Sequence, residues 1–317
     1  MVGLLLLLSY VSVLVFLIAV VWRFVKISRL PLHLRWELYP VAHEKGRAHY
    51  GGSYLEESDW WTKPRHSSLI GELKVMIPEI LLLAGVWEHN RKHWFRSFPF
   101  HFGLYLLAGL IGLLVVGGMA EAAGVAITAE GTAVAKVLYH ATRFLGYAGL
   151  GVALLGTVAL LARRMFEADY REYTKTADYI NLAFFALTLA VALAAHTTAD
   201  SSFAVLRDYV SRFLTLNMVS SEATVSLSAW SVAEIALGSV LLAYIPLTHM
   251  SHFFTKWFMY HDIRWNDEPT SAGGKIEQQI GEVLQYPVSW SASHIRGDGK
   301  KTWADVATSG VEESKEQ

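Results

Sequence analysis

Apolar residues gather in long runs along this chain of 317 residues, and polar segments separate the runs. A helix needs about 20 apolar residues to cross the hydrocarbon core of a bilayer. The segments that meet this requirement are Leu4–Trp22, Phe98–Met119, Thr142–Ala162, Tyr179–Ala195 and Trp230–Phe254. The pattern therefore predicts an all-α integral membrane bundle of five transmembrane helices.

Composition supports the same fold class. Apolar residues make up 53% of the chain and charged residues 17%, whereas soluble domains carry about 25% charged residues. The formal net charge of −1 gives no indication of a nucleic-acid partner. The chain has no cysteine, which excludes disulfides, c-type haem attachment and iron–sulfur clusters held by thiolates of this chain.

Basic residues orient the predicted bundle, because Lys and Arg concentrate in cytoplasmic segments. Segment 23–97 carries twelve of them, segment 163–177 four and the C-terminal segment seven, whereas 120–141 carries one and 196–229 two. We therefore expect the N-terminus outside and the C-terminus in the cytoplasm, in a multi-pass protein of the inner membrane. No basic residue precedes the first apolar run, so this run is predicted to be an uncleaved anchor.

Two stretches outside the predicted spans have helical patterns. Gly71–Arg91 predicts a helix lying at the inner membrane surface. A sixth span is the alternative, but the charged side chains in this stretch make it costly. Phe203–Leu216 predicts a short amphipathic helix on the outer face. In the polar C-terminal tail, about the last ten residues are expected to be disordered.

Two histidines lie at matching depth on different predicted spans. His101 lies at the inner end of the second span, and His252 lies near the inner end of the fifth. Two neutral imidazoles can hold a b-type haem with six-coordinate, low-spin iron. Gly112 and Gly238 lie about 20° and 40° from these histidines on the helical wheel, which leaves room for a macrocycle. Interfacial histidines without a cofactor are the alternative.

Position alone leaves the ligand on the fifth span open. His249 precedes His252 by three residues and lies about 60° around the helix. A second haem could be held by His140 and His196, which lie at the outer ends of the third and fourth spans. For this second pair too, interfacial histidines are the alternative.

Charged residues near the outer surface predict a quinone site. Glu234 lies eighteen residues before His252, on almost the same helical face, and could take the proton of a quinol. Arg143 and Lys136 could orient a quinone carbonyl or a haem propionate. The alternatives are a solvated carboxylate at the interface and two side chains that reach toward the headgroups.

Short motifs on three spans resemble the gamma subunit, the membrane cytochrome b, of respiratory nitrate reductase. The fifth span carries Glu234-x-x-x-Gly238 followed by Pro246 and His252. The second carries Phe100-His101-x-Gly103, and the third ends with Arg163-Arg164-Met165-Phe166. The segment RWELYPVAHE…YGGSY…WW resembles a branch of this family from sulfate-reducing organisms.

The resemblance implies particular ligands. It assigns the haem on the cytoplasmic side to His101 and His252, and so favours His252 over His249. The family's outer haem uses one more histidine on each of these two helices, but those positions are Ile111 and Glu234 in this chain. The outer haem is therefore expected to be absent or relocated, with His140 and His196 as the relocated pair.

The resemblance also implies an organisation and partners. We expect a first transmembrane helix at 1–22, a cytoplasmic loop with an interfacial helix at 23–97, a four-helix haem-binding membrane core at 98–262 and a cytoplasmic tail at 263–317. The implied partners are a cytoplasmic iron–sulfur protein akin to a heterodisulfide reductase subunit and a periplasmic multihaem cytochrome c.

The predicted function is transfer of electrons between the membrane quinone or menaquinone pool and the iron–sulfur partner, within a respiratory oxidoreductase complex used in anaerobic respiration. No residue is predicted to be catalytic by itself. The residues are compatible with either direction of electron flow. The alternative is a haem-free anchor or a small transporter, although the spans lack the internal repeat and broken helices of many transporters.

Overall fold

The computed structural model describes residues 1–30, 58–59, 62, 68–217, 227–255, 272–292 and 295–309. Its chain forms two compact units, one of Met1–Val20 and Val75–Ser251 and the other of Val21–Lys74 and His252–Gln317. The YGGSY motif and the last residues, for which we expect disorder, lie outside the described ranges.

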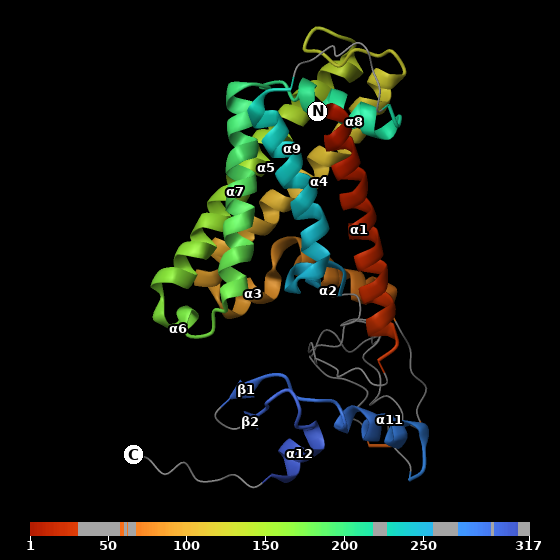
Figure 1. Cartoon of the computed structure of the whole chain (residues 1–317), viewed down its shortest axis with the longest axis vertical. Helices are drawn as coiled ribbons and strands as arrows, with labels where there is room; N and C mark the ends of the chain where they lie inside the picture. Colours follow the sequence, from red (N-terminus) through yellow and green to blue (C-terminus); the bar gives the residue numbers. More distant parts are fainter. Residues whose placement is uncertain are drawn as a thin grey trace. The chain divides into compact units, whose positions relative to one another are not determined.

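Within these ranges, five helices are long and apolar enough to cross a membrane (Figure 1). They are α1 (Val2–Ser28), α4 (Arg91–Ala122), α5 (Ala133–Phe166), α7 (Thr176–Thr198) and α9 (Ala229–Tyr244), the last extended by a 3-10 turn to Leu247. The prediction of an all-α bundle with five spans is confirmed. Several helices extend beyond the predicted apolar runs. Their polar end turns continue the helical pattern of backbone hydrogen bonds.

Helices α4 and α5 approach each other closely because glycines lie at their contact. A Cβ atom on Gly103 would overlap the backbone of Ala153, and a Cβ on Gly156 would overlap the backbone of Phe100. Small residues allow backbones to come this near, which is how helices gain packing energy inside a lipid bilayer. This contact fixes the segment of α4 that carries His101.

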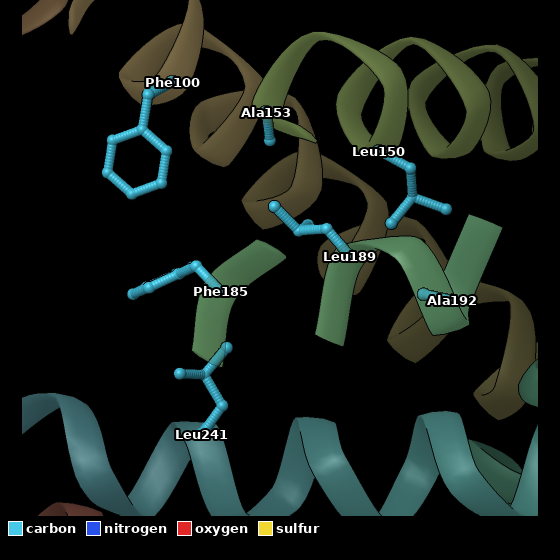
Figure 2. Packing of buried hydrophobic residues seen from close by; sticks show 7 residues of the cluster. All are labelled: Phe100, Leu150, Ala153, Phe185, Leu189, Ala192 and Leu241. Carbon is cyan, nitrogen blue, oxygen red and sulfur yellow. The ribbon is translucent and has the colours of Figure 1, made fainter. Parts of the chain in front are cut away.

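The core of the bundle lies where α4, α5, α7 and α9 meet. Figure 2 shows Phe185 and Leu189 of α7 between Leu241 of α9 and the α5 residues Leu150 and Ala153. Phe100 of α4 meets Phe185 edge-on, with ring centroids 5.2 Å apart. The side chains of α7 therefore pack between those of α4, α5 and α9 in the core.

The short helix α8 (Ala204–Leu214) confirms the helix predicted over Phe203–Leu216. It packs on α4, and it meets α1 near the N-terminus of the chain (Figure 1). The Tyr10 and Phe213 rings stack with centroids 4.5 Å apart, and the Tyr10 hydroxyl donates to the Phe213 carbonyl over 2.7 Å. We call this end of the bundle the α8 end.

The segment Gly71–Arg91 forms two helices, so the prediction of one continuous helix is wrong. Helix α2 (Leu69–Leu82) contains Pro78, and α3 (Ala84–His89) begins after Leu83, whose φ of 52° is left-handed. Side chains bind the backbone groups that the break exposes. The Glu79 carboxylate accepts from the Gly85 N–H over 2.7 Å, and the Trp94 indole donates to the Leu82 carbonyl over 2.7 Å.

The predicted fifth helix through Phe254 is also too long. Regular helix ends at Tyr244, and 3-10 turns follow at Ile245–Leu247 (η3) and His249–Ser251 (η4). Pro246 explains the change, because proline has no N–H to donate to the carbonyl four residues earlier and its ring crowds that carbonyl. Helical geometry returns only at 252–255.

The sequence did not predict five short elements, one after α5 and four in the tail. Helix α6 (Ala168–Arg171) follows α5. In the tail, α11 (Lys275–Leu284) is followed by an antiparallel pair of two-residue strands, β1 (Ser291–Ala292) and β2 (Ile295–Arg296), and by α12 (Trp303–Thr308). Val288 is almost fully buried in this part of the tail. The tail therefore has folded structure before its end.

Candidate functional site

His101 lies on α4 with one ring nitrogen bound to its own helix. Its Nδ1 lies 2.8 Å from the Ser97 carbonyl oxygen, one turn earlier. A carbonyl only accepts, so Nδ1 carries the proton and the lone pair is on Nε2. Metal-binding histidines are commonly oriented in this way by a hydrogen bond to the other ring nitrogen. The donor chemistry of His101 therefore fits haem iron through Nε2.

The two candidate ligands near the end of α9 differ in their surroundings. His249 lies in η4 with its Nδ1 3.4 Å from the Asn181 amide nitrogen and its Nε2 3.4 Å from an Asp178 carboxylate oxygen. The Tyr244 hydroxyl donates to the Asn181 side-chain oxygen over 2.7 Å, which completes a polar cluster. His252 follows η4 and belongs to the other unit. Its pairing with His101 stays a prediction.

An apolar cavity of about 470 Å³ lies among the helices of the bundle and is partly open to its surface. On α4 its wall begins at Leu104, one turn from His101, and continues to Leu114. On α9 it runs from Glu234 to Leu242 and on to Ile245 in η3, and residues of α1, α5, α7 and α8 complete it. Most ligand pockets are apolar with a few placed polar groups, and this cavity has that character.

The two positions at which the family resemblance places outer haem ligands, Ile111 and Glu234, both line this cavity. Gly238 lines it as well, and a Cβ atom there would meet nothing within 4 Å. The cavity thus offers space beside a carboxylate, without the histidine pair that would hold a second iron at these positions.

Glu234 is bound to His196, and the sequence did not predict this contact. Glu234 Oε1 lies 2.8 Å from His196 Nε2, and His196 Nδ1 lies 2.9 Å from the Asp200 carbonyl oxygen. His196 is buried, whereas its proposed haem partner His140 is exposed. Both ring nitrogens of His196 are engaged, so iron binding there would require one of these hydrogen bonds to break.

The two cations expected near the quinone do not contact Glu234. The Arg143 Nε donates to the Ser201 carbonyl over 3.1 Å, and its guanidinium lies 5.6 Å from the centre of the Tyr139 ring. Lys136 is exposed at the start of α5. Arg143 is therefore tied to the turn after α7, close in the chain to the Asp200 that holds His196.

Sequence reasoning also missed a hydroxyl cluster on the cavity wall. The Ser9 hydroxyl lies 2.7 Å from the Tyr209 hydroxyl and 2.8 Å from the Ser239 hydroxyl. Burial raises the pKa of Tyr209, so its phenol stays protonated. These hydroxyl groups link α1, α8 and α9. The sequence does not predict this cluster, because single serines and tyrosines are common in membrane helices.

Arg163, the first residue of the basic pair at the end of α5, has a structural role. The buried Arg163 lies 2.7 Å from His93 Nδ1 and 2.8 Å from a Glu167 carboxylate oxygen, and its guanidinium stacks 3.6 Å from the Tyr170 ring. A second arginine, Arg96, pairs with Glu167 over 2.7 Å. These contacts join the start of α4 to the end of α5.

Comparison with protein families gives one match over residues 86–265, to the nitrate reductase gamma subunit. The matched region covers more than half of the chain and includes every span except α1. No curated protein matches the chain. No solved structure matches it either.

Proposed function

The chain belongs to the nitrate reductase gamma subunit family, and we propose that it passes electrons between a membrane quinone and an iron–sulfur partner in the cytoplasm. Members of this family are membrane cytochrome b subunits that transfer electrons, so the chain is a multi-pass membrane protein of this kind. The match over 86–265 is the observation that carries the proposal.

His101 and His252 are the residues proposed to hold haem b. The hydrogen bond from His101 Nδ1 to Ser97 supports this assignment because it directs the lone pair of Nε2 away from the helix backbone. His252 is proposed as the second ligand because the family resemblance favours it over His249. Haem held by two imidazoles supplies a one-electron centre with no open position for oxygen.

The cavity is the proposed site of the quinone ring. Its wall is apolar, as a ring with an isoprenoid tail requires, and Glu234 supplies a polar group that can bind a ring hydroxyl. The ring would occupy the space in which the family resemblance places a second haem. Arg143 is proposed to act indirectly, by holding the turn after α7. For Lys136 we propose only an interfacial position.

The proposed docking of the iron–sulfur partner depends on which side of the membrane the polar segments occupy. We propose that segment 23–97 and the tail lie on the cytoplasmic side of the inner membrane, because their basic residues favour the N-out orientation. The folded part of the tail presents Trp290 and Leu284, which are exposed by 44% and 40%. Exposed aromatic residues are enriched at protein interfaces, which supports docking of the heterodisulfide-reductase-like partner on the tail. A multihaem cytochrome c would bind the opposite side.

The visible spectrum and haem content of the purified chain test the cofactor proposal. We expect the Soret band and reduced alpha band of a low-spin b-type haem, with about one haem per chain. A content near two would instead favour a second haem at His140 and His196. A spectrum without these bands would refute the electron-transfer role and favour a haem-free anchor or transporter.

A leucine at Gly238 should block the cavity. The substitution adds a side chain where a Cβ meets no atom within 4 Å, so it fills space rather than displacing the helix. We expect binding of a short-chain naphthoquinone to weaken by at least about tenfold, or roughly 1.4 kcal/mol. Haem reduction by the corresponding naphthohydroquinone should slow as well.

The matched control is Gly112→Leu. A Cβ atom at Gly112 would also meet no atom within 4 Å, but Gly112 is exposed and does not line the cavity. This variant should bind the naphthoquinone as the unchanged chain does. Equal binding by the Gly238 variant would show that the ring lies elsewhere.

A further inference from the structure

His196, which binds Glu234, is fixed by a ring-stacking contact and by hydrogen bonds. His196 lies in the last turn of α7, its ring stacks on Phe203 with centroids 3.6 Å apart, and its Nδ1 donates to the Asp200 carbonyl. Phe203 itself fits against Gly146 of α5, where a Cβ atom would overlap its ring. The Tyr147 hydroxyl donates to the His196 carbonyl over 2.8 Å. The imidazole therefore has one orientation.

This orientation fixes the number of protons between His196 and Glu234. The Asp200 carbonyl can only accept, so His196 Nδ1 carries a proton. The bond of 2.8 Å between Nε2 and Oε1 then holds one more proton, which belongs either to the imidazole or to the carboxyl. An Asp200 carboxylate oxygen lies 3.8 Å from Nδ1 and favours the positively charged ring.

The other carboxylate oxygen of Glu234 has a different environment. In the described part of the chain, no hydrogen bond reaches Oε2, and it is not among the fully enclosed polar atoms that lack a partner. Glu234 lines the cavity, and its side chain is 13% exposed. One oxygen is thus bound to His196, and the other remains for a group inside the cavity.

We infer that His196 and Asp200 are positioning residues that hold the Glu234 carboxylate so that Oε2 accepts a hydrogen bond from a hydroxyl of a hydroquinone ring in the cavity. The inference rests on the proposed quinone site. The imidazole offsets the charge that a buried carboxylate would otherwise carry alone. It also places the shared proton on the side of Glu234 that faces the α8 end, where the neighbours of Asp200, Ala199 and Ser201, are exposed.

A purely structural role is the competing explanation. The contact between His196 and Glu234 joins α7 to α9, and it could serve only to hold these helices together. The two roles differ in what they predict for the state of the carboxyl. A positioning role requires the vibration of the Glu234 carboxyl to depend on His196 and Asp200, even in a chain whose helices remain packed.

Infrared difference spectra of the full chain, recorded with and without a short-chain naphthohydroquinone, test the inference. The carboxyl band that Glu234→Gln removes identifies Glu234. We expect His196→Gln to shift this band and to weaken naphthohydroquinone binding by about tenfold. Asp200→Asn keeps the backbone carbonyl and nearly the same shape, so it should move the band in the same direction by a smaller amount.

His249→Gln is the matched control, because it changes a histidine that binds polar side chains elsewhere in the bundle. It should alter neither the band nor the affinity. A folded His196→Gln or Asp200→Asn chain with an unchanged band and affinity would overturn the inference. If Gly238→Leu and His196→Gln both leave binding intact, the proposed quinone site is wrong. If Gly238→Leu weakens binding while His196→Gln does not, the quinone site stands and the inference about His196 fails.

Discussion

The low-spin haem b spectrum should disappear when either His101 or His252 is replaced by alanine. Each substitution removes one of the two proposed axial nitrogens, and five-coordinate iron has a different spin state and absorption. We expect haem content to fall well below one per chain in both variants. The absorption spectrum and the electron paramagnetic resonance signal of the purified full chain measure this loss directly.

His249→Ala is the control for this prediction. His249 lies three residues from His252, and its ring nitrogens lie near Asn181 and Asp178. The variant should therefore keep the low-spin spectrum. A normal spectrum in His252→Ala together with its loss in His249→Ala would reverse our choice of ligand, while leaving the proposed role of His101 intact.

The second large effect is expected at the contact between α4 and α5. In Gly156→Ala, the added methyl group would overlap the backbone of Phe100, which cannot move aside as a flexible side chain could. Overpacking of this kind costs about 1–3 kcal/mol and occasionally more. We expect a clear fall in the thermal or denaturant midpoint of the chain in detergent, and a lower yield of haem-containing protein.

Gly151→Ala provides the comparison on the same helix. A Cβ atom at Gly151 meets nothing within 4 Å, so the same chemical change adds no overlap. This variant should be at least as stable as the unchanged chain, because alanine favours helix over glycine by up to about 1 kcal/mol. Equal stability of the two variants would show that α4 and α5 do not touch at Gly156.

The spans were predictable because the length of an apolar run is a local property of the sequence. The C-terminal end of the fifth helix was not predicted, although Pro246 was a visible signal against a continuous helix. In the tail, Thr302 and Asp305 form a capping box at the start of α12. That spacing was present in the sequence, but short elements leave little periodicity by which to find them.

The site was only partly predictable. The sequence drew attention to Glu234 and His196 separately, since ionisable residues in spans are rare. It could not pair them, because a contact between residues 38 positions apart depends on how α7 and α9 pack. The same limit explains why His196 was matched with His140, another histidine at the outer side. Helical-wheel angles between Glu234 and His252 also fail once the helix changes at Pro246.

The glycine contact between α4 and α5 has a consequence for the two proposed haem ligands. Gly103 is two residues from His101, and the contact that it makes with Ala153 involves protein atoms alone. Helix packing alone therefore sets the position of His101, the proposed first haem ligand. The proposed second ligand, His252, follows the break in the last helix at Pro246. The two proposed ligands therefore differ in what determines their positions: helix packing determines the first, and the segment after Pro246 determines the second.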